Sequence, residues 1–242
     1  MFEQRAVAFL DILGFSEFLR QAETTPQKKN EFDVLKHLID SHIRWNNEHL
    51  APTVPDAVKP KYIFISDSIV LSAPLSEQGF DGLVVVSQTC IDLSHKLLEK
   101  GFLLKGGISV GSVWQEPGNI FGSAYIEAYL LHEKARGPTI ELTTRAIDHL
   151  KGASHRNAPL TILELWITQP DGRVTLDALY PSYIRGVTQY ARTEHAFKQY
   201  RAWIHVRLDE LTRFGSAWEK WEMMRNLFND ALARHHINVP KL

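Results

Sequence analysis

The chain has 242 residues, of which 44% are hydrophobic, and its 27 Lys and Arg nearly balance its 28 Asp and Glu. This length is sufficient to bury a hydrophobic core, and a net charge of −1 gives no polybasic surface for nucleic acid or an anionic membrane. The single cysteine, Cys90, cannot form an internal disulfide, and we expect it to be a core residue. No secretory signal or membrane-length apolar run is present, so we expect a cytoplasmic protein without a membrane or stable nucleic-acid partner.

The first distinctive stretch is a short apolar run that ends on an acid. Residues 6–10 predict a buried strand, and Asp11 follows it directly. Gly14 and Ser16 allow a tight turn, and the helix that this turn opens has N-terminal amides suited to phosphate. Because a carboxylate in apolar surroundings usually has a cation nearby, the segment predicts a site for a metal ion and a triphosphate.

The next sixty residues are predicted to lead to a second strand region. Residues 21–30 are polar and contain Pro26, which indicates a surface loop. Apolar residues at helical spacing over 32–45 predict a helix that lies on a sheet. Residues 51–60 contain three prolines and are interpreted as a connecting segment.

A second acid lies in surroundings like those of the first. Residues 62–71 predict two strands that meet in a hairpin at 66–68, with Asp67 at its tip. Two carboxylates on adjacent strands can hold two divalent ions about 4 Å apart. The alternative interpretation is that Asp67 only forms the turn.

The middle of the chain completes a recognisable order of elements. Residues 80–98 predict a long helix, and residues 102–110 predict a strand interrupted by Gly106 and Gly107. These glycines permit either a close backbone approach or a bulge. Strand, helix, hairpin, helix and strand give the βαββαβ order of a ferredoxin-like α/β (α+β) core.

The remainder is predicted to extend this core and end in helices. We expect a loop at 113–118, a helix at 123–134, a strand at 139–143 followed by a helix capped by Thr143 or Thr144, and a hairpin at 160–178. Beyond residue 190 the apolar spacing indicates long helices. We therefore predict a catalytic domain over 1–180 and a C-terminal helical extension over 181–242.

Four segments in this order resemble the motifs of class III nucleotidyl cyclases. They are residues 9–16 (FLDILGFS), 65–67 (ISD), 105–111 (KGGISVG) and 119–122 (NIFG). More narrowly, the chain is similar to the free-standing pyrimidine cyclases of bacterial Pycsar antiphage systems, which make cyclic UMP or cyclic CMP. The resemblance implies a homodimer that converts UTP or CTP to a cyclic nucleotide and pyrophosphate.

The resemblance also implies roles for particular residues. Asp11 and Asp67 would ligate two Mn²⁺ or Mg²⁺ ions, with the backbone carbonyl of Ile12 as a further ligand. The β and γ phosphates would be held by backbone amides of the turn, which are those of Leu13, Gly14, Phe15 and Ser16.

Base selection is expected to differ from that of purine cyclases. Where adenylyl cyclases have a Lys and an Asp, this chain has Ile63 and Asn119, and the Glu of guanylyl cyclases is absent as well. Asn119 can both donate and accept a hydrogen bond, which suits uracil or cytosine, although it can equally be a plain loop residue. Tyr62 is a further candidate for filling the space that a smaller base leaves.

The chain also departs from the family pattern. Positions where many class III enzymes carry an Asn and an Arg that support the transition state hold Ile126 and Leu130. Candidate replacement cations, each equally interpretable as a structural or solvated residue, are Lys105, His132, Lys134 and Arg136. The competing hypotheses are an adenylate or guanylate cyclase, and a degenerate cyclase-like module that only binds nucleotide or dimerises.

Overall fold

The computed structural model describes residues 1–49, 55–152, 164–181 and 189–242. Its centre is β1 (Glu3–Leu13), in a sheet with the order β2-β3-β1-β6-β8-β10-β9. The other strands are β2 (Lys61–Ile65), β3 (Ser68–Pro74), β6 (Leu103–Glu116), β7 (Asn119–Gly122), which pairs with β6, β8 (Ile140–Leu142), β9 (Trp166–Thr168) and β10 (Val174–Leu176). A separate small ribbon is formed by β4 (Ser76–Glu77) and β5 (Phe80–Asp81).

The order of elements confirms the predicted ferredoxin-like core. The chain passes from β1 through α1 (Phe15–Thr24) and α2 (Pro26–His49) to the β2–β3 hairpin, and then through α3 (Gly82–Leu98) to β6. β3 and β6 both pair antiparallel with β1, and β2 pairs antiparallel with β3. The fold is therefore a mixed α+β fold with β1 between its two neighbours.

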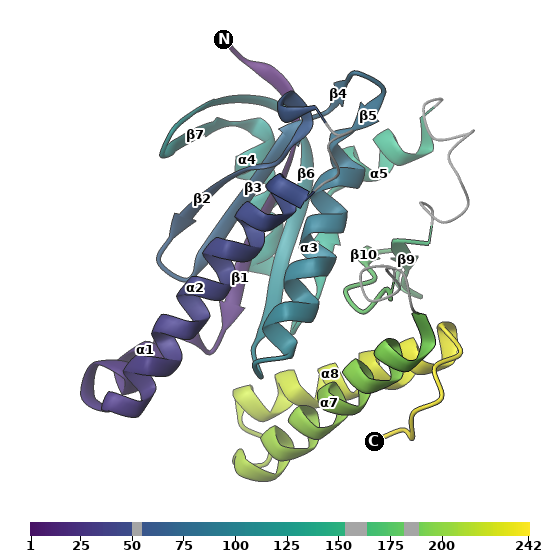
Figure 1. Cartoon of the computed structure of the whole chain (residues 1–242). Helices are drawn as coiled ribbons and strands as arrows, with labels where there is room; N and C mark the ends of the chain where they lie inside the picture. Colours follow the sequence, from purple (N-terminus) through teal and green to yellow (C-terminus); the bar gives the residue numbers. More distant parts are fainter. Residues whose placement is uncertain (50–54, 153–163, 182–188) are drawn as a thin grey trace.

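The two faces of β1 are covered by different helices because side chains alternate along a strand. Ala8 and Leu10 join the core under α2 and α3, whereas Val7 and Phe9 pack with residues of α4 (Ser123–Lys134). Figure 1 shows α2 and α3 in front of the sheet and α4 behind it. By the same alternation, Asp11 belongs to the face that α4 covers.

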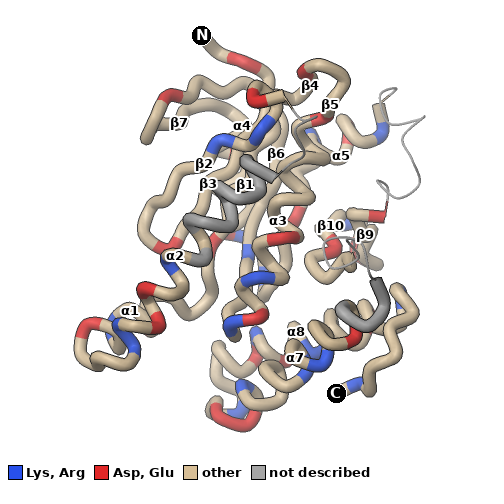
Figure 2. The backbone as a smooth tube through the Cα atoms, viewed as in Figure 1, with Lys and Arg blue, Asp and Glu red and all other residues tan. Residues whose placement is uncertain are grey.

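The C-terminal part is a pair of helices, α7 (Gln189–Glu210) and α8 (Ser216–Arg234), which lies beside one end of α3 (Figure 1). The rings of Phe197 and Phe228 stack at 5.8 Å between centroids, and their cluster includes Leu98 and Leu103 from the core. The helices α7 and α8 therefore pack on the core. Both acidic and basic residues are distributed over the two helices (Figure 2). The domain boundary at 180 stays a prediction.

Two predicted loops are wrong. Residues 21–30 are helical apart from Thr25, and Pro26 is the first residue of α2, where its missing N–H has no helical partner to lose. Residues 113–118 are not a loop either, because β6 continues to Glu116 and only two residues turn the chain into β7.

Several smaller predictions have clear outcomes. The Thr143 side chain caps α5 (Thr144–Lys151) by accepting from the Ala146 amide, as expected. Cys90 is fully buried in the core, and this burial raises the pKa of its thiol. The hairpin predicted over 160–178 is shorter, from Trp166 to Leu176, and its residues 160–163 lie outside the described part.

The connection before β2 is described only in part. In the predicted connecting segment, residues 51–54 lie outside the described part, and Asp56–Val58 form a short 3-10 helix. Among the helices in the described part of the chain, none has the length and apolar character needed to span a membrane.

Candidate active site

The structure brings the two predicted acids to the same end of the sheet. Asp11 is opposite Ser68 in the β1–β3 register, and Asp67 is the residue before Ser68. The Ile12 amide donates to the backbone carbonyl of Asp67 at 3.2 Å, which ties the end of β1 to the hairpin. Ser66 has a φ of +58°, a left-handed conformation that turns β2 sharply into β3. Both acids are partly exposed, so solvent and ligands can reach them.

The predicted phosphate turn adjoins these acids. Gly14 has φ +82° and is the N-cap of α1, with no side chain capping the helix. The first amides of α1 therefore lack side-chain acceptors, as an anion site requires. Ser16 Oγ donates to Asp67 Oδ2 at 3.3 Å, so the turn and the second acid are in contact.

The turn residues are held in place by their own packing. The side chain of Phe15 is buried in the main core, while Leu13 is the last residue of β1. The contribution of residues 13–15 to a ligand is thus restricted to the backbone. Glu17 lies in the first turn of α1 and forms an ion pair with Arg20 at 3.0 Å.

The two carboxylates have no Lys or Arg partner among the described residues. The single charged-group contact of Asp11 is with His132 Nε2, at 3.8 Å from Oδ2. No cluster of three or more His, Cys, Asp and Glu side chains suited to a metal occurs in the described ranges. The donor set is thus two carboxylates and adjacent backbone oxygens, and hard oxygen donors of this kind fit Mg²⁺ or Mn²⁺.

The four candidate cations from the sequence lie in different places. Lys105 is directly opposite Asp11 in the β1–β6 register, which places both side chains on the face covered by α4. His132 is buried beside Asp11. Lys134 and Arg136 are exposed and form no ion pair with a described residue. Lys105 and His132 are therefore the two candidates that the structure brings to the acids.

Gly106 and Gly107 allow a close approach of the backbone and form no bulge. Both residues keep an uninterrupted antiparallel register with β1. A Cβ atom at Gly107 would lie 2.3 Å from the carbonyl oxygen of Ala128, so β6 and α4 touch backbone to backbone. The close neighbour of Gly107 is thus a helix of the same chain, which the sequence pattern did not indicate.

The predicted base-reading residues lie around the far end of β2. Ile63 is buried and Tyr62 packs edge-on against Phe64, with ring centroids 5.5 Å apart. A cavity of about 560 Å³ is lined by Tyr62, Ile63 and residues of the β6–β7 turn up to Gly118. Asn119 is exposed and is the residue after Gly118. Tyr62 thus borders a cavity next to Asn119.

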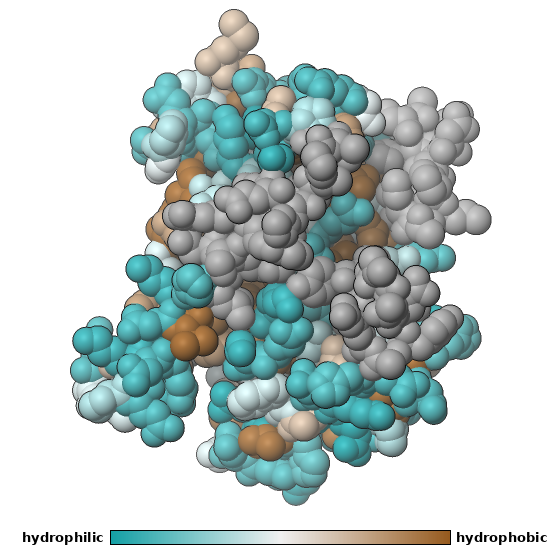
Figure 3. All heavy atoms as spheres, in the orientation of Figure 1, coloured by the Kyte–Doolittle hydropathy of each residue, from teal (hydrophilic) through white to brown (hydrophobic). Residues whose placement is uncertain are grey.

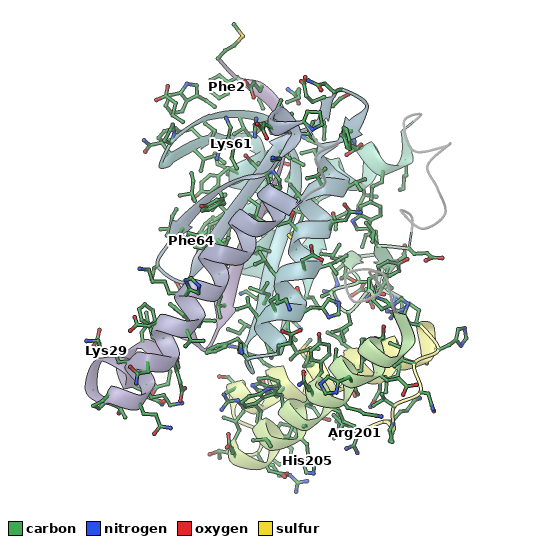
Figure 4. The ribbon with its side chains drawn as sticks, in the orientation of Figure 1. Phe2, Lys29, Lys61, Phe64, Arg201 and His205 are labelled. Carbon is green, nitrogen blue, oxygen red and sulfur yellow. The ribbon has the colours of Figure 1, made fainter. Side chains whose placement is uncertain are left out.

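Ile126 and Leu130 extend into solvent from α4, where they are 54% and 49% exposed. Other apolar side chains are also exposed on β2, β7 and α4, namely Phe64, Ile65, Phe121 and Tyr129. Figure 4 places Phe64 at the edge of the sheet, and Figure 3 shows apolar surface in that area. The positions expected to carry an Asn and an Arg therefore hold exposed apolar side chains on α4, whereas Phe64 borders a pocket with Phe32 and Ile39 of α2 on the other face of the sheet.

Neither a protein-family model nor a curated protein sequence matches this chain. Solved structures with similar folds include the adenylyl cyclase CyaB from P. aeruginosa, at 17% identity and TM-score 0.46 over 62% of this chain and 82% of that one. Another is the guanylate cyclase domain of RhGC from Catenaria anguillulae in complex with GTP, at 14% identity and TM-score 0.47 over 72% and 93%. A third is a class III adenylyl cyclase-like ATP-binding protein from Pseudomonas aeruginosa, at 14% and 0.47 over 81% and 40%.

Proposed function

We propose that this protein is a cytoplasmic, homodimeric nucleotide cyclase of the class III type, which converts UTP or CTP to the 3′,5′-cyclic nucleotide and pyrophosphate. The observation that carries this proposal is the contact between the phosphate turn and Asp67, whose backbone is hydrogen-bonded to the end of the strand that carries Asp11. Ser16 Oγ donates to Asp67 Oδ2, and the Ile12 amide donates to the Asp67 carbonyl. A triphosphate on the turn would thus lie beside both carboxylates.

The chemistry assigned to the site is an intramolecular displacement at phosphorus. The ribose 3′ oxygen attacks the α phosphorus, the bond to the pyrophosphate oxygen breaks, and the proton of the 3′ hydroxyl passes to water. Asp11, Asp67 and the Ile12 carbonyl would hold two Mn²⁺ or Mg²⁺ ions, which when bound neutralise phosphate charge and activate the attacking oxygen. The protein's own part is orientation of the triphosphate and electrostatic stabilisation.

The remaining residues at this end are suited to the triphosphate itself. The backbone amides of residues 13–16 would hold the β and γ phosphates, helped by the partial positive charge at the start of α1. Lys105, on the same sheet face as Asp11, adds a cation that can approach the triphosphate. A cation at this position partly replaces the charge that Leu130 cannot supply.

A pyrimidine is the proposed base because the purine-reading ionic pair is missing. Ile63 is apolar and buried, and Asn119 carries no charge. Tyr62 at the wall of the neighbouring cavity narrows the space, and the Asn119 amide offers one donor and one acceptor to a pyrimidine edge. Cyclic UMP is the proposed product, and its proposed role is second-messenger signalling in antiphage defence.

A second copy of the chain is the proposed partner. Ile126, Tyr129 and Leu130 are exposed apolar side chains of α4, and covering them removes apolar area from water. In such a dimer the metal and phosphate residues of one chain would face the base-reading residues of the other. A monomer is then expected to be inactive.

The second candidate function is a degenerate cyclase module that binds nucleotide without turning it over. One observation favours it: the two positions expected to stabilise the transition state hold Ile126 and Leu130, which are apolar and exposed. The two retained carboxylates oppose it, because an interaction module gains no stability from acids that have no Lys or Arg partner among the described residues.

The test is product analysis after the protein is incubated with each of the four ribonucleoside triphosphates and Mn²⁺ or Mg²⁺. A cyclic pyrimidine nucleotide that disappears in Asp11→Ala and Asp67→Ala supports the proposal. Asp209→Ala, which removes an exposed acid of α7, is the matched control and should leave turnover unchanged. Asn119→Asp should alter the preference among the four bases. No product from any triphosphate, with nucleotide binding intact, would favour the degenerate module.

A further inference from the structure

His132 is a buried side chain whose hydrogen bonds are missing. It lies in the last turn of α4 and is 6% exposed. Among the described residues neither Nδ1 nor Nε2 has a hydrogen-bond partner, and both nitrogens are buried. Buried polar groups nearly always have partners, so a ring with two unpaired nitrogens requires an explanation.

The close packing of α4 on β6 determines where this ring lies. Without a Cβ at Gly107, the backbone of α4 contacts β6, and the His132 amide is 3.0 Å from the position that a Cβ would take. The imidazole then lies over β1, with its centroid 5.0 Å from that of the Phe9 ring and 6.3 Å from that of Tyr129. The location of His132 thus follows from the packing of α4 against β6 and β1.

Each ring nitrogen has a carboxylate near it, beyond hydrogen-bond length. Nε2 is 3.8 Å from Asp11 Oδ2, and Nδ1 is 3.5 Å from Glu133 Oε1. Glu133 is 55% exposed, so its carboxylate can be solvated by water. Asp11 is 22% exposed and is fixed at the end of the central strand, so it is the partner with the restricted geometry.

We propose that His132 is a positioning residue for Asp11. If Asp11 holds a divalent cation, Nε2–H of His132 would donate a hydrogen bond to Oδ2 and so fix the orientation of the carboxylate. This hydrogen bond needs a closing movement of roughly 1 Å from the present 3.8 Å, because such hydrogen bonds are about 2.8–3.0 Å long. This inference rests on the proposed role of Asp11 as a metal ligand.

The burial of the ring favours this role over direct ligation. The accessible area of Nε2 is nearly zero, and Phe9 and Tyr129 flank the ring. An ion that also reaches Asp67 and a triphosphate must approach from the exposed side of the Asp11 carboxylate. The imidazole then acts on the ion through the carboxylate, as outer partners of metal ligands commonly do.

The experiment measures Mn²⁺ binding to the full chain without nucleotide, by the loss of the free-ion signal in electron paramagnetic resonance. His132→Phe keeps a ring but no donor, and His132→Asn is too short to reach Asp11, so each should weaken binding about 10-fold or more. His132→Gln, whose amide can reach, should bind within about threefold of the wild type. Because two of the three variants are polar, a folding failure of the Phe variant leaves the comparison intact.

Two further proteins separate the possible failures. His205→Phe breaks an exposed His–Asp pair on α7 and should leave Mn²⁺ binding unchanged. Asp11→Ala should abolish binding, and equal binding by Asp11→Ala and wild type would overturn the metal role in the proposed function. Wild-type binding by folded His132→Phe would overturn only the positioning role. Direct ¹⁴N coupling from a bound imidazole in pulsed spectra would overturn it in favour of ligation.

Discussion

Two regions of this molecule treat buried polar groups in opposite ways. Where the C-terminal helices meet the core, Asp177 is 3% exposed and accepts from Arg234 at 2.7 Å and from His235 at 2.8 Å. At the end of β1, the carboxylates of Asp11 and Asp67 have no Arg or Lys partner in the described part of the chain, and His132 lies 3.8 Å from Asp11, beyond hydrogen-bond length.

Within the described ranges, the buried histidines His95 and His132 show the same contrast. His95 donates from Nε2 to the Tyr180 carbonyl and accepts at Nδ1 from the Tyr200 hydroxyl, both at 3.0 Å. Both nitrogens of His132 remain unpaired. Satisfied groups hold helices and sheet together, whereas unsatisfied groups reduce stability and are tolerated where a ligand completes them. This difference distinguishes the candidate active site from the contact of the C-terminal helices with the core around His95 and Asp177, which we call the joint.

The largest expected effect is the loss of turnover when a carboxylate at the end of β1 is removed. Asp67→Ala removes one proposed metal ligand and should lower cyclase activity about 100-fold or more, because charge stabilisation at the phosphates is lost. The free energy of unfolding should hardly change, since the acid has no ion-pair partner to strand. Turnover assays and urea titrations measure both, and unchanged turnover would remove Asp67 from the site.

The joint should make the protein sensitive to acid. Burial lowers the pKa of His95 to about 4 from the ordinary value of 6.5. Between these values the unfolded chain takes up a proton that the folded chain does not, so stability falls as pH decreases from 6.5 towards 4. The loss reaches about 3 kcal/mol near pH 4. Urea titrations across this pH range should show that the free energy of unfolding depends less on pH in His95→Gln than in the wild type. Identical pH dependence in the two proteins would contradict the effect assigned to His95.

Replacing Asp177 should lower the free energy of unfolding by less than the expected loss near pH 4. Asp177→Asn leaves Arg234 and His235 without their carboxylate in a mostly buried position. We expect a loss of about 2 kcal/mol in the free energy of unfolding, reduced from that of a fully buried pair because Arg234 is 35% exposed. Asp230→Asn on α8, an acid at which no ion pair with a described residue occurs, is the control. Equal stability of the two variants would contradict the structural role of the joint.

The exposed surfaces of the two regions should also differ. Leu130→Glu places a charge on the apolar surface of α4 and should weaken homodimer association about 10-fold, with a matching fall in specific activity on dilution. Val206→Glu, which changes an exposed apolar residue of α7, is the matched control and should not alter association. Analytical ultracentrifugation over a concentration series measures both. An active monomer would contradict the shared site.

Local sequence patterns predicted the core and the elements that carry Asp11 and Asp67. The βαββαβ order, the hairpin with Asp67 at its tip and the turn at Gly14 follow from local patterns, and the structure contains all three. Of the two misassigned loops, residues 21–30 contain Pro26, which indicated a loop but begins α2, and at residues 113–118 the strand β6 continues to Glu116.

The ion pairs of Asp177 and the position of His132 depend on contacts that no local pattern encodes. Asp177 meets its cations 57 and 58 positions later in the chain. His132 was one of four cation candidates, and its place beside Asp11 depends on the backbone contact between Gly107 and α4. Such groupings arise from tertiary packing, so residue type and spacing could suggest the members but not their assembly.

The most direct test of the central claim is the free energy of unfolding of wild type and of the Asp11→Asn, Asp67→Asn double variant, each with and without Mn²⁺. Without metal we expect the double variant to be at least as stable as the wild type, because two uncompensated carboxylates are removed. Mn²⁺ should then stabilise only the wild type. If the double variant loses several kcal/mol without metal, or if Mn²⁺ shifts both proteins equally, the acids are structural and the proposed site is wrong.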